Sequence, residues 1–236
     1  MDAVIEYPKT ENLFKRDPET HKLIVGDLRV PEFGIVGAWH VTEKIDGTNM
    51  RLIYDPLEET LKVRGRSDRA QVPPDLQHYM LTLAPIEAFQ RVFDEFIMSR
   101  QGNLDAVVTI YGEGYGAGIQ KGGSYCPEKR FRAFDVLYSW PISGGYRHSW
   151  THPSTTTMLL GMLGIPQAPV VAEGAPLEDV IDLVVAYQRG FLLSATAYHD
   201  SSSDCSPEGL VARTDPYLYN EKGERVMFKL KVKDLP

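Results

Sequence analysis

Residues 42–49, Thr-Glu-Lys-Ile-Asp-Gly-Thr-Asn, constrain the fold of this chain more than any other segment. β-branched and apolar residues flank an Asp-Gly pair, a pattern typical of a strand that ends in a tight turn. Lys44 lies between two carboxylates just before that turn. A lysine at a strand end can act as a nucleophile when burial and neighbouring cations help its amine lose a proton. The alternative interpretation is an exposed hairpin that carries a surface lysine.

Composition limits the function classes. The chain has 236 residues, enough to bury a core as one large domain or two small ones. Its net charge of -7 argues against a generally basic nucleic-acid coat, so any contact with nucleic acid requires a local basic patch. Cys126 and Cys205 form no C-x-x-C pair, and we expect reduced thiols. Without a signal-peptide pattern or about eighteen consecutive apolar residues, we expect a cytoplasmic protein that does not enter a membrane.

Hydrophobic periodicity predicts the remaining elements. We expect strands at 39–41, 50–54, 61–64, 105–111, 131–138, 169–172, 208–213 and 226–233, helices at 85–100, 156–163 and 177–189, and a polar loop at 199–204. The hairpin formed by the second and third strands delivers Arg66, whose guanidinium offers a bidentate fork for phosphate.

The glycine-rich segment 111–123 follows the fourth predicted strand. Dense glycines let a backbone approach a ligand closely, although the spacing does not match a phosphate-binding P-loop. Glu113 is the informative residue here, because a carboxylate at a strand end can accept hydrogen bonds from ribose hydroxyls. The alternative is a turn glutamate that faces water. In the next strand, Phe131 and Phe134 point to opposite faces, so one can pack in the core and the other against a purine.

The last predicted strand has lysines at every second position. Alternation places Lys229, Lys231 and Lys233 on one face, with apolar residues on the other. Three like charges in a row repel one another, so this face favours binding of an anion. The alternative is an edge strand that lysines protect from aggregation.

Taken together, these segments resemble the RNA ligase 2 family of ATP-dependent polynucleotide ligases, which are covalent nucleotidyltransferases. The resemblance rests on E-K-I-D-G-T-N at 43–49, the arginine at 66, Y-G-E-G-Y-G-A-G-I-Q-K at 111–121, F-R-A-F-D at 131–135, E-G-L-V-A-R at 208–213 and K-L-K at 229–231. It departs from the best-known member at Asp46, where that protein has histidine. Because the sequence ends soon after Lys231, it resembles a minimal phage-type member without the C-terminal domain that grips the duplex.

The resemblance implies an α+β nucleotidyltransferase (ATP-grasp-like) fold of two packed, mostly antiparallel sheets with flanking helices, as a single adenylyltransferase domain over residues 1–236. It also implies a three-step reaction. Lys44 attacks the α-phosphorus of ATP to form lysyl-AMP, the AMP passes to an RNA 5′-phosphate, and a 3′-hydroxyl then seals the break. The implied cofactors are ATP and Mg²⁺ or Mn²⁺. The implied partner of this monomer is nicked or broken RNA, including tRNA, in RNA repair.

The same resemblance assigns a role to each matching position. Four residues receive catalytic roles, and the others contact the nucleotide. The catalytic residues are Lys44, Glu208 (which also supports the metal), Lys229 and Lys231; the nucleotide contacts are Glu43 at the adenine amino edge, Asp46, Asn49, Arg66, Glu113 at the ribose, Phe134 stacked on adenine, and Arg213.

Two other functions remain open. Within the same enzyme class, the chain could join DNA ends or use GTP for capping. In a different class, it could be a nucleotide- or RNA-binding module that has lost catalysis. The intact set of Lys44, Glu113, Glu208, Lys229 and Lys231 argues against such a module, because binding alone has no chemical need for all five.

Overall fold

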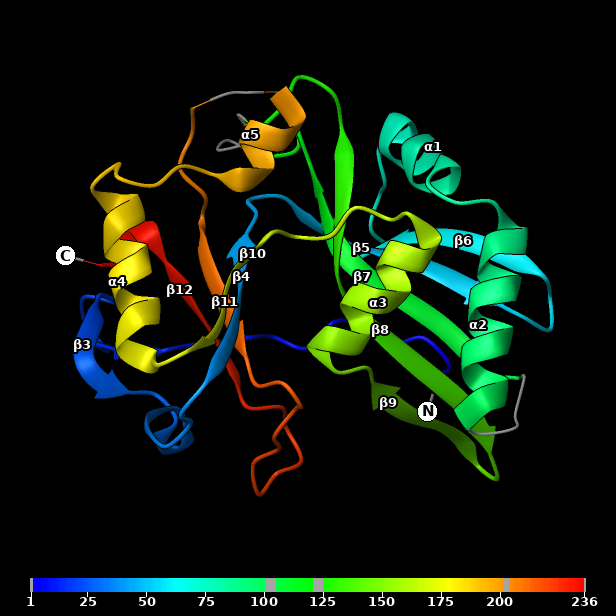
Figure 1. Ribbon diagram of the computed structural model, residues 1–236, viewed down its shortest axis with the longest axis horizontal. Coiled ribbons are helices and arrows are strands. Elements are labelled where there is room, and N and C mark those ends of the chain that lie inside the picture. Colours follow the sequence, from blue (N-terminus) through cyan, green and yellow to red (C-terminus); the bar gives the residue numbers. More distant parts are fainter. Residues whose placement is uncertain (1, 101–104, 121–124, 202–203, 236) are drawn as a thin grey trace. The chain divides into compact units, whose positions relative to one another are not determined.

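The computed structural model describes residues 2–100, 105–120, 125–201 and 204–235, apart from the side chains of residues 94 and 96–100. The chain forms two compact units, each with its own sheet and hydrophobic core (Figure 1). Unit 1 comprises Met1–Tyr7, Gly47–Gln120 and Glu128–Gln167; unit 2 comprises Pro8–Asp46, Lys121–Pro127 and Ala168–Pro236. The expected single domain over residues 1–236 stays a prediction, whereas the α+β class is confirmed.

Unit 1 contains a five-stranded antiparallel sheet in the order β6-β5-β7-β8-β9. Three helices, α1, α2 and α3, lie along one face of this sheet (Figure 1). The elements are β5 (Thr48–Asp55), β6 (Thr60–Gly65), α1 (Pro74–Thr82), α2 (Ile86–Arg100), β7 (Val107–Tyr115), β8 (Arg130–Ile142), β9 (Gly145–Trp150) and α3 (Pro153–Leu163).

Alternation along β5 determines which side chains face the helices. Met50, Leu52 and Tyr54 are buried in the core together with apolar residues of all three helices. Because successive side chains of a strand point to opposite faces, Asn49 and Arg51 lie on the second face of the sheet. That second face, rather than the helix-covered one, carries the polar residues of unit 1.

The N-terminal residues of the chain lie against this second face. The Tyr111 hydroxyl donates to the Ile5 carbonyl at 2.7 Å, and the Tyr7 hydroxyl donates to a carboxylate oxygen of the fully buried Asp135 at 2.8 Å. The Tyr7 ring also packs edge-on against Phe134, with 5.0 Å between ring centroids. These contacts hold residues 2–7 across the sheet.

Unit 2 contains a five-stranded sheet in the order β1-β12-β11-β4-β10, in which only the β1–β12 pair is parallel. A two-stranded sheet, β2-β3, accompanies it. The elements are β1 (Glu11–Asn12), β2 (Phe14–Arg16), β3 (Leu23–Leu28), the 3₁₀-helix η1 (Pro31–Gly34), β4 (Trp39–Lys44), β10 (Val170–Ala175), α4 (Leu177–Gln188), α5 (Ala195–Ser201), β11 (Gly209–Arg213), β12 (Met227–Lys231) and the 3₁₀-helix η2 (Val232–Asp234).

One face of the unit 2 sheet packs against α4. Val180 and Val184 of this helix are fully buried together with Trp39, Leu210 and Phe228 of the sheet. This apolar face leaves the alternate residues of β4 and β12 on the opposite face, where the lysines lie.

Several elements differ from the sequence predictions. β7 continues through the glycines to Tyr115, so Glu113 lies within a strand and not in a turn. The reason is packing: a Cβ at Gly112 would lie 2.4 Å from the Phe131 ring, so this glycine makes room for the core. The predicted loop at 199–204 is wrong for residues 199–201, which end α5. Residues 121–123 of the glycine-rich segment and residues 202–203 of that loop lie outside the described part of the chain.

The last strand is shorter than predicted. β12 ends at Lys231, and Lys233 belongs to η2, so the row of lysines on the strand contains two members and not three. The edge-strand alternative is also wrong, because β1 pairs with β12 on its second side. Within the described residues, no helix combines the length and the apolar character that crossing a membrane requires.

Candidate active site

Lys44, at the end of β4, forms an ion pair with Glu208, and Lys231 on β12 forms a second ion pair with the other oxygen of the same carboxylate. The three side chains are largely shielded from solvent, with exposed fractions of 22%, 13% and 23% for Lys44, Glu208 and Lys231. The sheet of unit 2 therefore gathers three of the four predicted catalytic residues into one charged cluster.

Strand register explains why these residues meet. Gly209, the residue after Glu208, is the pairing partner of Lys44 on one side and of Lys231 on the other. The Glu208 amide donates to the Lys44 carbonyl at 3.1 Å, and the Glu208 carbonyl accepts from Val232 at 3.0 Å. A Cβ at position 209 would lie 2.2 Å from the Leu230 carbonyl oxygen, so the tight approach of the strands requires glycine.

The cluster shifts the ionisation of its members. Burial alone would raise the pKa of Glu208, but the ammonium groups of Lys44 and Lys231 outweigh burial and lower this pKa below its ordinary value. Lys229, on the same face of β12, has a lowered pKa because it is buried and because Lys231, Lys44 and Lys9 lie nearby. An anion placed here would relieve the repulsion among these lysines.

Glu43 points to the opposite face of β4 from Lys44, as neighbours along a strand must. Its carboxylate is 2% exposed. One oxygen accepts from the Ser194 hydroxyl at 2.6 Å and the other from the Thr196 amide at 3.2 Å, at the start of α5. The structure thus places Glu43 as a buried anchor for α5, and its contact with an adenine stays a prediction.

The turn after Lys44 is held by Tyr125. The Asp46 amide donates to the Tyr125 hydroxyl oxygen at 3.1 Å, and the Tyr125 carbonyl accepts from the Ser201 hydroxyl at 2.6 Å. Burial raises the pKa of Tyr125, so this hydroxyl stays neutral over the ordinary pH range. Tyr125 was not a predicted site residue, because nothing in the sequence around it indicates contact with a residue 79 positions away.

Arg213 does not join the lysine cluster. It lies at the far end of β11, paired with His40, whereas Gly209 pairs with Lys44. Four residues of a strand span about 13 Å. Arg213 is nearly buried and lowers the pKa of His40, whose own burial is the larger cause of that shift.

Unit 1 brings together a second group of predicted residues. Asn49 on β5 and Glu113 on β7 are direct pairing partners, so their side chains share one face of the sheet. The Asn49 side-chain oxygen is buried, and no described atom donates a hydrogen bond to it. Phe134 lies at a bulge between β7 and β8, and Phe131 is the one of the two phenylalanines that is buried in the core. The ring of Phe134 packs against Tyr7, which the sequence did not indicate.

Two arginines of unit 1 lie in opposite environments: Arg66 is exposed and Arg51 is buried. Arg66, a predicted phosphate contact, is exposed in the loop after β6. Arg51, which was not predicted, is 1% exposed; its guanidinium donates to the Gly65 carbonyl at 2.8 Å and to Asp68 at 2.7 Å. These two bonds attach β5 to the residues on either side of Arg66. The only local signal for this role was a lone charged residue in an otherwise apolar strand.

Solved structures with the same fold cover nearly the whole chain. A variant of the Naegleria gruberi RNA ligase with ATP and Mn matches with a TM-score of 0.57 and 16% identity over 97% of this chain and 56% of that chain. An archaeal ATP-dependent RNA ligase matches with a TM-score of 0.57 and 16% identity over 98% and 49%. A chain assigned as an ATP-dependent DNA ligase from Aquifex aeolicus matches with a TM-score of 0.55 and 16% identity over 96% and 50%.

These matches define the fold as that of the nucleotidyltransferase ligases, as predicted. The sequence model of the RNA ligase family matches residues 37–231, and the chain belongs to the RNA ligase family. It spans about half the length of the solved structures that it matches. No curated protein sequence matches it.

Proposed function

We propose that this protein is an ATP-dependent RNA ligase that uses Lys44 as its nucleophile. The observation that supports the proposal most strongly is the cluster in which Lys44 and Lys231 share the carboxylate of Glu208, within a chain of the RNA ligase family. A surface lysine on an exposed hairpin would have neither the shielding nor the basic neighbours.

The proposed reaction begins when the Lys44 nitrogen, after losing a proton, attacks the α-phosphorus of ATP. A P–N bond forms, the bond to pyrophosphate breaks, and lysyl-AMP results. The AMP then passes to an RNA 5′-phosphate, and attack by a 3′-hydroxyl seals the strand and releases AMP. Lys229 and Lys231 supply positive charge where the phosphoryl oxygens gain negative charge, which is the main need of phosphoryl transfer.

Glu208 is the residue that would hold a divalent metal ion. Among the described residues, no group of three or more His, Cys, Asp or Glu side chains could form a complete metal site. Mg²⁺ is commonly held by one or two carboxylates together with substrate phosphates and water. When bound, the metal would supply further charge neutralisation at the phosphates. The Naegleria gruberi neighbour with ATP and Mn supports the choice of nucleotide and metal.

The proposed substrate is RNA with a nick or break that leaves a 3′-hydroxyl and a 5′-phosphate, and the proposed context is RNA repair, including repair of tRNA. Asn49, Glu113 and Phe134 on the second face of unit 1 are the proposed contacts for ribose and adenine. Asp46, Arg66 and Arg213 stay proposed nucleotide or phosphate contacts. We propose that the protein acts as a cytoplasmic monomer.

The test is incubation with α-labelled ATP and Mg²⁺ or Mn²⁺. Label should attach covalently to the wild-type protein and disappear in Lys44→Ala. Lys233→Ala is the matched control, because this exposed lysine lies outside the strand and should leave labelling intact. Failure of the wild-type protein to take up label would favour a binding module without catalysis.

A DNA ligase is the second candidate, because the Aquifex aeolicus chain assigned as a DNA ligase shares this fold. A panel of nicked duplexes in which each strand is RNA or DNA separates the two. We expect sealing when the strand with the 3′-hydroxyl is RNA. Efficient sealing of all-DNA nicks alone would favour the second candidate, and labelling by GTP in preference to ATP would favour a capping enzyme.

A further inference from the structure

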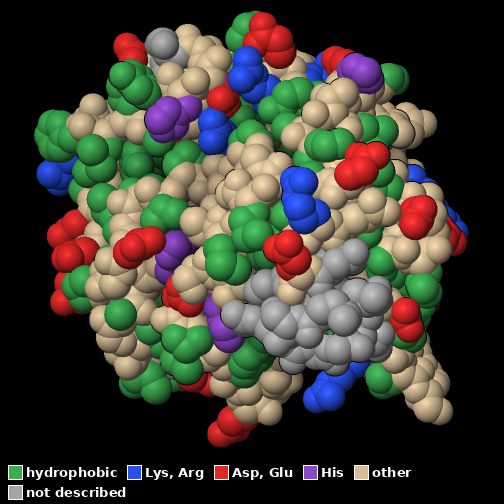
Figure 2. All heavy atoms as spheres, turned by 45° about the vertical axis from the view of Figure 1, so that its right-hand side comes forward, with side chains coloured by type: hydrophobic (Ala, Val, Ile, Leu, Met, Phe, Trp, Pro, Cys, Tyr) green, Lys and Arg blue, Asp and Glu red, His purple; other side chains and the backbone are tan. Residues whose placement is uncertain are grey.

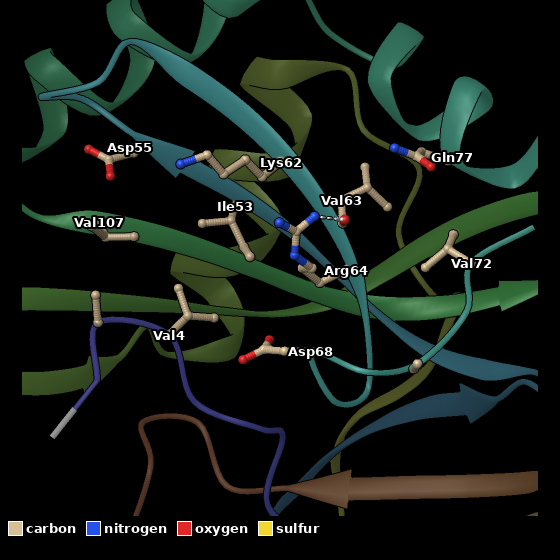
Figure 3. Close-up of a pocket in the computed structure, with 12 residues that line it drawn as sticks. Val4, Ile53, Asp55, Lys62, Val63, Arg64, Asp68, Val72, Gln77 and Val107 are labelled. Atoms are coloured by element: carbon tan, nitrogen blue, oxygen red, sulfur yellow. Dashed lines mark hydrogen bonds between the residues drawn. The ribbon is translucent and has the colours of Figure 1, made fainter. Parts of the chain in front are cut away.

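We infer that a groove in unit 1 binds the sugar–phosphate backbone of an RNA strand; the RNA identity of the partner rests on the proposed function. The groove has a volume of about 610 Å³, which is within the usual range for ligand sites. β5, β6, the loop after β6 and the N-terminal residues form its walls (Figure 3). Its lining includes Val4, Ile53, Lys62, Arg64, Asp68 and Val72.

Arg64 contributes a positive charge to this groove. Its side chain extends into the groove and donates to the Val63 carbonyl at 3.0 Å (Figure 3). Within the described residues it makes no ion pair. Lys62 extends into the groove two residues earlier on the same strand and pairs with Glu58, but both partners are about half exposed. Such surface pairs contribute little free energy, so a phosphate can replace Glu58.

The acidic residues of the lining already have partners. Asp68 accepts from the buried guanidinium of Arg51 at 2.7 Å. Asp55 accepts from the amides of Leu57 and Glu58 at 3.1 and 3.2 Å and so caps the turn between β5 and β6. The guanidinium of Arg51 thus offsets the charge of Asp68.

The segment 60–70, which includes Lys62, Arg64 and Asp68 of the lining, is more basic than the chain as a whole. Residues 60–70 include four basic residues, Lys62, Arg64, Arg66 and Arg69, and one acidic residue, Asp68, which gives a net charge of +3 in a chain of net charge -7. On the face drawn in Figure 2, the described basic side chains are scattered among acidic ones. The segment 60–70 is therefore a local basic patch of the kind that a generally acidic chain needs to contact nucleic acid.

The shape of the lining selects the backbone of the strand rather than its bases. The apolar walls come from aliphatic side chains such as Val4, Ile53, Val72 and Val107, and none of the described residues that line the groove carries an aromatic ring. Bases bind single-strand sites by stacking on aromatic rings, whereas basic groups contact phosphates without reading sequence. Ile53 and Asn49 share the second face of the sheet, so the groove continues the face that carries Glu113.

The test measures binding of short single-stranded RNA to wild-type protein and to a Lys62→Gln/Arg64→Gln double variant at several salt concentrations. We expect the affinity of the double variant at about 0.1 M salt to fall roughly tenfold, and the slope of log K against log salt to decrease in magnitude by about 1.4, since each of the two lost phosphate contacts on a single strand contributes about 0.7. Oligouridine and a mixed sequence should lose affinity equally.

Arg147→Gln/Lys222→Gln is the control, because it removes the same charge at two exposed positions outside the groove. It should keep the wild-type affinity and slope. Circular dichroism and thermal unfolding check that both double variants are folded. Equal affinity and slope in the groove variant and the wild type, no RNA binding by the wild type, or a loss confined to one RNA sequence would overturn the inference. Labelling by ATP tests the proposed function separately. If ATP labels the protein but the groove substitutions leave RNA affinity unchanged, only the inference about the groove is refuted.

Discussion

Lys44 and Glu208 form a shielded ion pair although 164 residues separate them in the chain. The same carboxylate also binds Lys231, so Glu208 connects the end of β4 to the last strand of the sheet. Lys44 must leave this ion pair before its nitrogen can attack a phosphorus atom. We therefore propose two roles for Glu208: it positions the amine of Lys44, and its carboxylate binds the metal ion.

Replacement of Glu208 by Gln should reduce labelling by ATP about 100-fold, a typical loss when a transition-state electrostatic group is removed. The change should also lower the free energy of unfolding by about 1–3 kcal/mol, because two partly buried ammonium groups lose their partner. Label uptake and urea unfolding measure the two effects. The exposed Glu221→Gln is the matched control and should change neither. Wild-type labelling in Glu208→Gln would remove this residue from the site.

The pH dependence of stability should report the same carboxylate. The pKa of Glu208 is lowered from its ordinary value of 4.5, so its ion pairs stabilise the protein above that pH. This contribution is lost as the pH falls through the lowered value, because the unfolded chain then takes up the proton first. Urea unfolding between about pH 6 and pH 3 should show a smaller decline in Glu208→Gln than in the wild type. Parallel declines in the two proteins would show that the pair adds no stability.

Gly209→Ala should disturb the cluster without removing any charged group. The new Cβ would lie 2.2 Å from the Leu230 carbonyl oxygen, so β11 and β12 must separate. We expect a loss of about 1–3 kcal/mol in the free energy of unfolding, together with weaker labelling. Gly161→Ala in α3 is the control, since its Cβ would meet no atom within 4 Å and alanine favours helices. Unchanged stability and labelling in Gly209→Ala would contradict the close strand approach.

Ser194→Ala should test the buried anchor of α5. The hydroxyl of Ser194 donates to Glu43 at 2.6 Å and accepts from the Ala197 amide at 3.1 Å, so its removal leaves a buried carboxylate with one donor fewer. A loss of about 1–3 kcal/mol in the free energy of unfolding is expected. Ser149→Ala, at an exposed position of β9, should have little effect. If the two variants unfold alike, Glu43 does not depend on Ser194.

The sequence predicted those parts of the fold and the site that rest on local patterns. The strand and turn around Lys44 and the alternation of Lys229 and Lys231 on β12 follow from β-branched residues, an Asp-Gly pair and a period of two. The class of fold and the members of the lysine cluster were expected from the resemblance to the RNA ligase 2 family, and not from these local patterns alone. The end of β12 could not be predicted, because Lys233 continues the alternation in the sequence although η2 replaces the strand at that point.

Long-range contacts left no local signal. Glu43 meets Ser194 across 151 residues, and Tyr7 meets Asp135 across 128, so nothing in either neighbourhood indicated the partner. The glycines near Glu113 were interpreted as a ligand loop, because the sequence does not show that the Phe131 ring packs on Gly112. The roles assigned to the site residues stay predictions. Each role is a contact with a bound nucleotide, which binding and labelling experiments must test.

The most direct test of the central claim is to map the adduct after incubation with ATP and Mg²⁺. Proteolysis and mass spectrometry should find AMP on the peptide that contains Lys44, bound through an acid-labile P–N bond. Absence of any AMP adduct, or an adduct on a different residue while Lys44 stays unmodified, would contradict the account.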